Sequence, residues 1–382
     1  MKSICIVTSK YPTPYNSSSL VFVQQLAWTL ADIGISVKVI CPIAINIDGS
    51  KGLKLPQKII EKTSSKNTVE VYFPKYIGFG QQKIGPYNTA SLTLNTFTKA
   101  VFHTIKLFQQ KPEVIYGHFI SPAGVSVARV GKRLNIPSYI AYGESSPWSI
   151  KNLGQEKVIR ELQTIKGIIS VSTKNKNDLL NLGIIDSEKI GVFPNAVRQE
   201  HFYQRDKQES RKRFNLPEKK FIVAFVGHFI ERKGIDKVIK AVNDLDNVYA
   251  IYAGKGPISP IGEKTLYSGM VNPEELPWFY SAADVFVLPT LNEGCCNAII
   301  EAMACGLPII SSDREFNYDI LSADSGILID PENQEEITEA INYTYANSSV
   351  RKTLSNASQK SANRLNYQQR AENIVNWVKE NV

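Results

Sequence analysis

The stretch Leu288–Ser312, which reads LPTLNEGCCNAIIEAMACGLPIISS, decides how this chain folds. The apolar run Asp284–Leu288 leads into it and ends at a proline, which is typical of a buried strand. Asn297–Cys305 is rich in alanine, isoleucine, glutamate and methionine and stops at Gly306, as a helix with a C-terminal glycine does. Leu307–Ser312 is again apolar and short, so the stretch predicts a strand, a loop, a helix and a second buried strand.

Two glutamates stand in this unit, Glu293 in the loop and Glu301 eight positions later on the helix. Because a helix rises about 1.5 Å per residue, Glu301 lies one to two turns beyond the loop. One carboxylate can therefore face the reacting end of an extended ligand while the other reaches a group farther along it. Between them, Gly294–Asn297 places backbone N–H groups at a helix N-terminus, which favours an anion such as a diphosphate.

This arrangement of two glutamates, with the EG pair, the EAMACG helix and the PIISS strand, resembles the signature of the retaining GT-B glycosyltransferases of family 4 (glycosyl transferases group 1). Members of that family transfer sugars from nucleotide-sugar donors. The resemblance covers nearly the full length and is strongest in residues 221–312. It implies an α/β chain with two Rossmann-like, doubly wound parallel-sheet domains facing each other across a cleft.

A second motif, Phe225–Gly234 (FVGHFIERKG), resembles the family element in which an arginine and a lysine hold the donor diphosphate. Lys233 matches the lysine and Gly227 the glycine, whereas His228 stands where the arginine is usual. Arg232, next to Lys233, or His228 itself is expected to supply the missing contact. A fixed cation aimed at the leaving diphosphate can contribute ~2.7–4 kcal/mol of transition-state stabilisation.

The resemblance also implies roles for the residues around the two glutamates. Glu293 would accept hydrogen bonds from sugar hydroxyls near the reacting carbon, and Glu301 from the ribose. The loop backbone would bind the diphosphate and the sugar through Gly294, Cys295, Cys296 and Asn297.

Three further segments match donor contacts of the family. Gly254 and Gly256 follow a predicted strand and resemble its G-x-G-P turn, a pattern that any tight turn also explains. Gly269–Val271 falls where the base is held through backbone atoms. His118 in the segment VIYGHFISPAG matches the histidine placed against the donor sugar from the opposite domain.

The first half of the chain departs from the family at two loops. Asn16–Ser19 replaces the usual glycine pair, and serines hinder the closest backbone approach to a ligand. Gly143–Ser146 lacks a frequent histidine and is expected on the acceptor side. Pro194–Val197 resembles a structural element at the domain junction.

A length of 382 residues predicts two domains of roughly 150–200 residues each. Short apolar strands alternate with helical patterns in both halves, which favours parallel, doubly wound sheets. The charged, strand-poor segment Arg198–Lys220 joins the halves, so we expect a first domain over 1–200 and a nucleotide-sugar-binding domain over 201–365. The tail 366–382 is expected to form an amphipathic helix with Ile374, Trp377 and Val378 on one side. The resemblance to GT-B proteins implies that this helix packs back on the first domain.

Charge and cysteine usage indicate the partners and the cellular location to expect. The net charge is +8, and residues 1–200 carry 24 Lys and Arg against 12 Asp and Glu. A basic first half fits peripheral contact with an anionic membrane as well as a solvated surface without a partner, and no nucleic-acid module is recognisable. The five cysteines show no framework spacing, and neither a signal peptide nor a membrane span is found, so a cytoplasmic protein is expected.

The sequence therefore predicts a retaining glycosyltransferase that moves a sugar from a UDP-sugar, favoured over a GDP-sugar, to a hydroxyl of a lipid-linked or oligosaccharide acceptor. No cofactor and no metal are expected, because Asp244–Asp246, the one D-x-D sequence, reads as a helix end. Two alternatives stay open: a sugar-nucleotide epimerase on the same scaffold, and a non-catalytic subunit that binds nucleotide sugar. A dehydrogenase is disfavoured, since no strand is followed by G-x-G-x-x-G.

Overall fold

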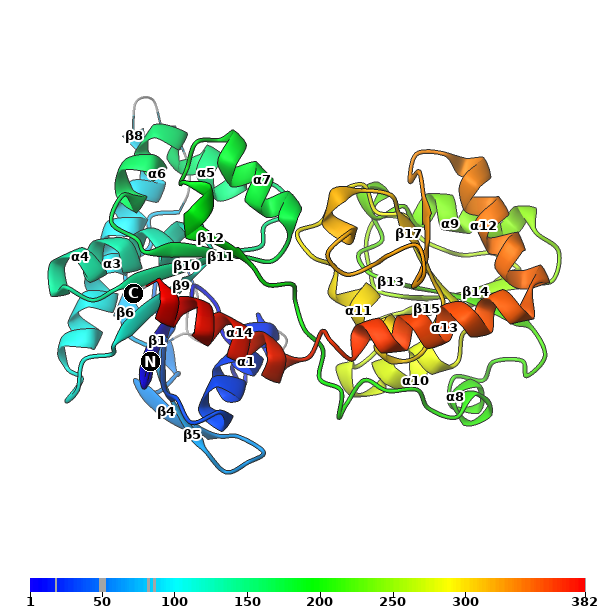
Figure 1. The fold of residues 1–382 in the computed structure, drawn as a ribbon, viewed down its shortest axis with the longest axis horizontal. Coiled ribbons are helices and arrows are strands. Elements are labelled where there is room, and N and C mark those ends of the chain that lie inside the picture. The colour runs from blue at the N-terminus through cyan, green and yellow to red at the C-terminus, as the bar shows by residue number, and fades with distance from the viewer. Residues whose placement is uncertain (18, 48–52, 81–82, 85–86, 382) are drawn as a thin grey trace. The chain divides into compact units, whose positions relative to one another are not determined.

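The computed structural model describes residues 1–17, 19–47, 53–80, 83–84 and 87–381, which form two compact units (Figure 1). The first unit comprises Met1–Phe193 together with Tyr367–Val382, and the second comprises Pro194–Asn366. The division between them falls just before the residue-200 boundary expected from composition. None of the described helices combines the length and the apolar character that crossing a membrane requires.

The first unit is built on an eight-stranded sheet with the order β12-β11-β10-β9-β1-β2-β5-β4. All neighbouring pairs are parallel except β4 and β5, which form an antiparallel hairpin at one edge. The strands are β1 (Ser3–Val7), β2 (Ser36–Ile40), β4 (Lys58–Lys62), β5 (Thr68–Tyr72), β9 (Val114–His118), β10 (Ser138–Tyr142), β11 (Gly167–Ser170) and β12 (Ile190–Val192). Two small ladders pair β3 (Ile43–Ala44) with β6 (Lys75–Tyr76) and β7 (Lys83–Ile84) with β8 (Tyr87–Asn88).

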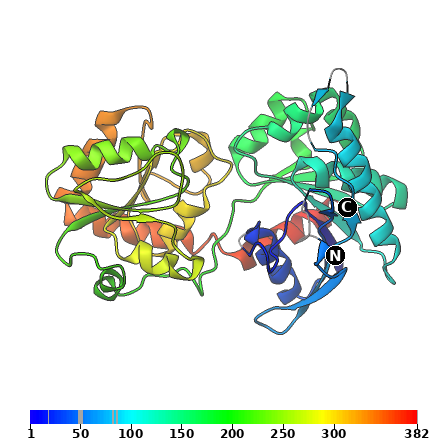
Figure 2. The same cartoon turned by 180° about the vertical axis from the view of Figure 1, so that it is seen from behind.

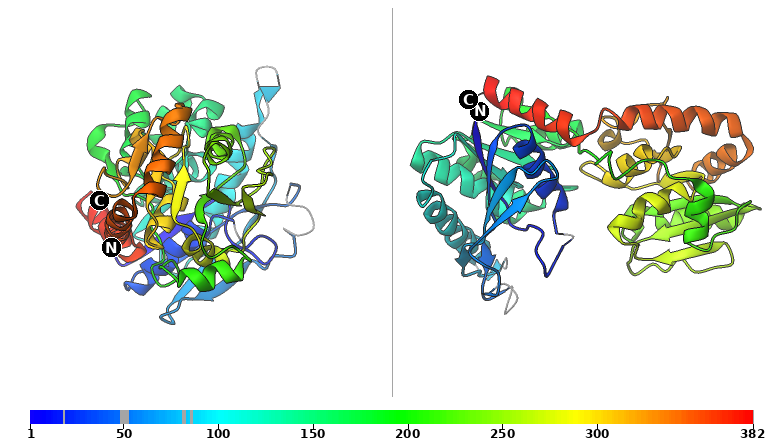
Figure 3. Two further views of the ribbon diagram at one scale, coloured as in Figure 1. Left: turned by 90° about the vertical axis from the view of Figure 1, so that its right-hand side faces the viewer. Right: turned by 90° about the horizontal axis from the view of Figure 1, so that it is seen from below.

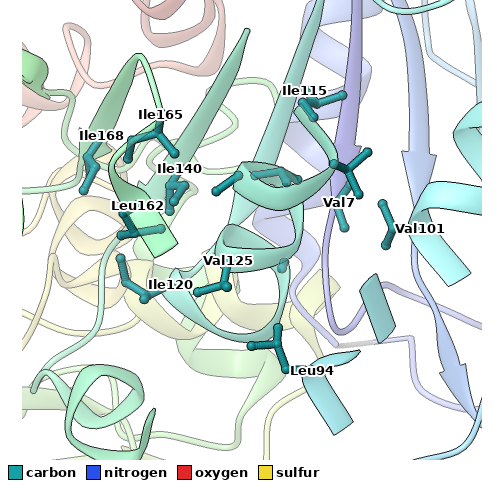
Figure 4. Close-up of a cluster of buried hydrophobic side chains, with 14 of the residues drawn as sticks. Val7, Leu94, Val101, Ile115, Ile120, Val125, Ile140, Leu162, Ile165 and Ile168 are labelled. Carbon is teal, nitrogen blue, oxygen red and sulfur yellow. The ribbon is translucent and has the colours of Figure 1, made fainter. Parts of the chain in front are cut away.

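Helices cover both faces of this sheet. They are α1 (Val21–Asp32), α3 (Thr89–Lys106), α4 (Val125–Leu134), α5 (Trp148–Leu153), α6 (Gln155–Leu162), α7 (Thr173–Asn181) and α14 (Tyr367–Glu380), with single turns at Ile120–Gly124 and Ser187–Lys189. On one face, α3, α4 and α6 bury an aliphatic cluster against the strands, including Val7, Leu94, Val101 and Ile115 (Figure 4). Buried aliphatic strands with helices on both faces are the pattern of a doubly wound sheet.

The opposite face is covered by α1 and by the C-terminal helix α14, which lie side by side (Figure 3). Its apolar stripe includes Ile374 and Val378, both buried, as the amphipathic pattern of the tail predicts. Trp377 packs against the rings of Tyr139 and Phe193, each at a centroid distance of 5.8 Å. Gly167 makes room for this indole, since a Cβ there would lie 2.4 Å from it.

The second unit has a six-stranded, wholly parallel sheet with the order β15-β14-β13-β16-β17-β18. Its strands are β13 (Phe221–Val226), β14 (Val248–Ala253), β15 (Thr265–Gly269), β16 (Val285–Leu288), β17 (Ile309–Ser312) and β18 (Ile327–Ile329). The chain builds outward from β13 in one direction and then from β16 in the other. The point where the order reverses therefore lies between these two strands.

The helices of the second unit are α8 (Lys207–Arg213), α9 (Ile235–Asp244), α10 (Leu276–Ser281), α11 (Asn297–Ala304), α12 (Gln334–Ala346) and α13 (Ser348–Ala362), with single turns at Glu231–Lys233, Pro273–Glu275 and Glu315–Asn317. Helices α9 and α12 pack together on one face of the sheet, and α10, α11 and α13 on the other (Figure 2). The predicted α/β architecture with doubly wound parallel sheets is confirmed in both units.

Candidate functional site

The candidate site lies where the strand order of the second unit reverses. Strands β13 and β16 are parallel neighbours, with Val223 opposite Val285 and Ala224 opposite Phe286. The loops that follow them, 227–234 and 289–296, therefore leave the same edge of the sheet side by side. Ligands of open α/β sheets bind at the carboxyl ends of the strands at this reversal.

Lys233 and Glu293 meet at this point. Lys233 Nζ lies 2.5 Å from Glu293 Oε1, and Arg232 Nη1 lies 3.1 Å from the same oxygen. The Thr290 hydroxyl donates to it as well, at 3.0 Å. The Lys233 and Glu293 side chains are only 12% and 13% exposed, whereas that of Arg232 is 39% exposed. Within the described residues, every polar contact of Glu293 is made by Oε1, so Oε2 is the oxygen left for a ligand.

Local sequence makes this meeting possible. Gly234 has φ +70°, and a Cβ there would lie 2.3 Å from the carbonyl oxygen of Pro289, so only glycine lets the two loops touch. Leu291 N donates to Arg232 O at 2.9 Å, which ties the loop backbones together. The Arg232 guanidinium also donates to the carbonyl of Asn292. The motif that contains Lys233 and the loop that contains Glu293 are thus one structural unit.

Helix α11 begins directly after this loop, with Cys296 as the N-cap residue. The Cys296 side chain makes no capping hydrogen bond within the described part of the chain, but the backbone N–H groups of Ile299 and Ala298 face its sulfur and offset part of the pKa rise that burial causes. Asn195 holds the loop from the side: its Nδ2 donates to Cys295 O at 3.2 Å and to Asn297 Oδ1 at 2.8 Å. Cys295, Cys296 and Gly294 are buried. Asn195 belongs to the Pro194–Val197 segment and has the structural role expected of it.

Glu301 lies on α11, and its Oε2 accepts a hydrogen bond of 3.0 Å from the hydroxyl of Tyr280. Burial raises the pKa of Glu301 to about 7, against the opposing effects of this hydrogen bond and of the positive charge of Arg198. A carboxyl with this pKa changes its charge near neutral pH, and it is poised to exchange hydrogen bonds with a hydroxyl ligand.

A pocket of about 300 Å³ adjoins the first loop and is formed by residues that follow β13, β14 and β15, among them His228, Lys255, Met270 and Val271. Gly254 has φ +152°, and a Cβ there would lie 1.8 Å from the carbonyl oxygen of Gly227. A Cβ at Gly256 would lie 2.3 Å from Phe229 O. The two glycines therefore let the turn after β14 lie directly on the loop after β13, and His228 is left exposed at the pocket.

His118 lies in the first unit at the end of β9, where that sheet also reverses its order between β9 and β1. The rings of Phe22 and Phe119 pack on it at centroid distances of 5.2 and 4.6 Å, and the residue is 6% exposed. Burial, and secondarily the charge of Arg370, lowers its pKa to about 3, so the imidazole is neutral. Its buried Nδ1 has no hydrogen-bond partner among the residues that the structure describes, which leaves one ring nitrogen available to a ligand.

Two other features of the first unit lie at the same sheet edge. The Glu144 carboxylate accepts hydrogen bonds from Ser149 Oγ (2.5 Å) and Ser149 N (3.2 Å), and burial raises its pKa. It thereby anchors the start of α5. A pocket of about 230 Å³ follows β1 and is lined by Lys10, Tyr11 and Asn16 among others. Of the Asn16–Ser19 loop, Ser18 lies outside the described residues.

Sequence reasoning missed a second carboxylate cluster in this unit. Glu61 on β4 accepts hydrogen bonds from Tyr11 OH (2.8 Å), Gln24 Nε2 (2.9 Å) and Trp28 Nε1 (2.7 Å). No local signal marks Glu61, because its three donors come from segments far away in the chain. Across the described residues, no group of three or more His, Cys, Asp and Glu side chains could hold a metal ion.

Comparison with known proteins agrees with this geometry. Residues 206–361 match the family model Glycosyl transferases group 1. The chain is 27% identical, over 349 residues, to the putative teichuronic acid biosynthesis glycosyltransferase TuaC of Bacillus subtilis, covering 88% of this chain and 87% of that protein. It is also 27% identical to an alpha-galactosylglucosyldiacylglycerol synthase of Streptococcus pneumoniae, over 57% of this chain and 62% of that one.

Solved structures show the same architecture over the whole length. Sucrose-phosphate synthase from Thermosynechococcus elongatus superposes with a TM-score of 0.75 at 19% identity, covering 100% of this chain and 99% of that one. Anabaena Alr3699/HepE in complex with UDP and glucose gives 0.73 at 16% identity, with 100% of both chains covered. The chain therefore has the GT-B fold and is related in sequence to glycosyltransferases, and its match to Glycosyl transferases group 1 spans the unit that holds Lys233, Glu293 and Glu301.

Proposed function

We propose that the chain is a retaining, metal-independent glycosyltransferase that moves a sugar from a UDP-sugar, in preference to a GDP-sugar, to a hydroxyl acceptor. One observation carries this proposal: the Lys233–Glu293 ion pair at the reversal point of the sheet that matches the glycosyltransferase family model. In this ion pair, the expected ligand of the cation is the diphosphate and the expected ligand of the carboxylate is the sugar. The diphosphate and the sugar are adjacent groups of one donor molecule.

The diphosphate would bind between Lys233 and the start of α11. When the bond between sugar and diphosphate breaks, negative charge grows on the leaving group, and Lys233, Arg232 and the N–H groups at the start of α11 would stabilise it. Glu293 Oε1 holds Lys233 before the donor arrives. A bound diphosphate would compete for the ammonium and release Glu293 to accept hydrogen bonds from the sugar hydroxyls.

The rest of the donor follows from the neighbouring elements. Glu301 would accept hydrogen bonds from the ribose, and the pocket lined by His228, Met270 and Val271 would take the base. His118 of the first unit would hold the sugar through its neutral ring. In the transfer, the anomeric carbon loses its bond to the diphosphate and gains one to the acceptor oxygen on the same face. The acceptor proton passes to the departing phosphate.

The acceptor would be a lipid-linked or oligosaccharide chain in the assembly of a surface polysaccharide, with the enzyme cytoplasmic and peripheral at the inner face of the membrane. The relative named for teichuronic acid biosynthesis and the basic first half of the chain support this setting.

The test begins with donor binding. Thermal shifts with UDP, GDP and ADP should show stabilisation by UDP that is lost in Lys233→Ala and kept in Lys240→Ala, an exposed lysine on α9. Product analysis with donor alone then separates the alternatives, because an epimerase would convert the nucleotide sugar without an acceptor. A non-catalytic subunit would bind UDP and turn nothing over. Stabilisation by GDP alone would reject the donor assignment.

A further inference from the structure

One cavity of the first unit lies away from all the residues assigned above. It is a groove of about 770 Å³ between the flank of α3 and the β4–β5 hairpin with β6. The residues that line it are Gln57, Lys58, Tyr72, Pro74, Lys75, Tyr76, Ile77, Phe79, Thr96, Lys99, Ala100, His103, Thr104 and Leu107. Its size is in the range of small-molecule sites, which span about 300–1,000 Å³.

Helix α3 presents two different stripes. Leu94 and Val101 belong to the stripe that points into the core (Figure 4). A second stripe, Thr96, Ala100, His103 and Leu107, recurs at helical spacing along the groove instead. From Thr96 to Leu107 it runs for roughly 16 Å along the helix at the usual rise per residue.

Three hydroxyl groups of the groove wall already have hydrogen-bond partners. The hydroxyl of Thr96 donates to Ile77 O at 2.7 Å, and that of Thr104 to Ala100 O at 2.9 Å. Tyr72 OH donates to Glu70 Oε2 at 2.7 Å. Methyl groups and ring faces are therefore left to form the wall, and a ligand that depends on many hydrogen bonds, such as a peptide, finds few partners there.

Large apolar side chains stay exposed at the rim. Leu107 is 83% exposed, Ile77 51% and Phe79 46%. Contiguous exposed apolar surface of this kind marks an interaction site.

Positive charge accompanies this apolar surface. Lys58, Lys75, Lys99 and His103 all line the groove, and no acidic side chain lines it within the described residues. Lys58 is paired with Glu70 at 2.8 Å, whereas Lys99 and His103 are exposed on α3 and no acidic side chain of the described residues pairs with them. An apolar trough edged by cations is complementary to an amphiphile with a hydrocarbon chain and an anionic head.

We propose that this groove accommodates an acyl chain of an anionic membrane phospholipid, with Lys99 and His103 beside the headgroup. The first unit would then sit on the membrane surface through α3 and β6. This site is independent of the donor site in the second unit and does not require the transferase activity.

Vesicle co-sedimentation of the full chain tests the proposal. Vesicles containing phosphatidylglycerol should pellet the protein, and vesicles of phosphatidylcholine alone should not. Leu107→Asp and Lys99→Glu should each reduce pelleting at least tenfold. The matched controls are Leu92→Asp, an exposed leucine on α3 that does not line the groove, and Lys132→Glu, an exposed lysine on α4. Both controls should pellet like the unmodified protein.

Soluble probes distinguish binding of the lipid's acyl chain from binding of its headgroup. Lysophosphatidylglycerol below its micelle concentration should raise the thermal midpoint, whereas glycerol 3-phosphate and lysophosphatidylcholine should not. Equal pelleting of Lys99→Glu and Lys132→Glu, or binding of glycerol 3-phosphate alone, would overturn the proposal. If the protein forms a dimer and Leu107→Asp dissociates it, the groove is instead the contact surface for a second copy of the chain. The thermal shift caused by UDP is measured on every variant and shows whether the donor site is unaffected. A result that contradicts the lipid proposal can therefore be told apart from one that contradicts the transferase assignment.

Discussion

At the scale of single residues, the candidate site is organised around one carboxylate oxygen with three donors around it. Glu293 Oε1 receives Lys233, Arg232 and the Thr290 hydroxyl, and the Lys233 and Glu293 side chains are mostly withdrawn from solvent. Pairing in a partly enclosed place keeps both charged groups in position before the ligand arrives. The motifs pointed to both residues, but only the structure shows that Lys233 and Glu293 contact each other.

Replacing this cation should affect turnover far more than stability. Lys233→Ala is expected to lower kcat ~10²–10³-fold, because a group that stabilises the charge developing on the leaving diphosphate is lost. Steady-state transfer assays with a UDP-sugar and an oligosaccharide acceptor give the measurement, with Lys240→Ala as the control. A Lys233→Ala enzyme as fast as the control would remove Lys233 from the mechanism.

Glu301 predicts a pH dependence of stability. Burial raises its pKa to about 7 in the folded protein, from an ordinary value of 4.5. The folded state therefore binds this proton more tightly than the unfolded state. The resulting stabilisation is complete below about pH 4.5 and is lost as the pH rises through 7. At about 1.36 kcal/mol per pKa unit, the loss is at most about 3 kcal/mol.

Glu301→Gln removes this titration. The free energy of urea unfolding of the variant, minus that of the unmodified protein, should increase from pH 5 to pH 8. For Glu263→Gln, at an exposed loop position, this difference should be the same at both pH values. An identical difference at both pH values would show that Glu301 is charged in the folded protein throughout this range.

At the scale of elements, the loops after β13, β14 and β16 are packed backbone on backbone, and glycines permit it. Gly254 lies against Gly227 O and Gly234 against Pro289 O. The donor contact that the resemblance implies for Gly254 stays a prediction, and the structure adds that the neighbouring loop requires a glycine at this position. Gly254 also lines the pocket beside His228, so a substitution that shifts this turn should alter the pocket as well as the stability.

Gly254→Ala should therefore destabilise the second unit by about 2 kcal/mol or more, because its backbone conformation and the nearby carbonyl both exclude a Cβ. The thermal shift caused by UDP should also be smaller in this variant. Gly262→Ala is the matched control, since a Cβ there meets nothing within 4 Å. Urea denaturation midpoints give the comparison, and equal midpoints for the two variants would contradict the steric argument.

At the scale of the whole molecule, the C-terminal helix belongs to the unit that the N-terminus begins. Helix α14 buries Ile374, Val375 and Val378 in the cluster formed by α1 and the first sheet. The chain thus leaves the first unit at Phe193 and returns to it at Tyr367. The folded first unit therefore includes residues that follow the second unit in the chain.

Deleting residues 367–382 should consequently lower the unfolding temperature of the first unit and leave the second unit's transition in place. Differential scanning calorimetry resolves the two, with UDP raising only the second-unit transition. Removal of residues 381–382 alone serves as the control. A truncated chain with an unchanged first transition would show that the α14 contacts contribute little.

Much of this architecture was predictable from sequence. The strand predicted in Asp284–Leu288, the helix predicted over Asn297–Cys305 and the strand predicted in Leu307–Ser312 are present as β16, α11 and β17, because buried parallel strands are short apolar runs and a glycine ends the helix. The edge strand Lys58–Lys62 was missed, since it is mostly polar and exposed and, among the described strands, it pairs with β5 alone. The helices Lys207–Arg213 and Ser348–Ala362 were also missed, because they contain few large apolar residues to mark a period.

The sequence by itself determined the alternation of strands and helices, because local apolar patterning and turn residues carry that information. Its resemblance to a known family pointed to the pairing of the Lys233 and Glu293 motifs and to the return of the tail to the first unit. Only the tertiary structure decided that Glu293 shares Lys233 through one oxygen, that Glu61 collects three distant donors, and that α3 leaves a cation-edged groove uncovered. These features depend on which distant segments become neighbours, and no spacing along the chain encodes a distance between side chains that the fold brings together.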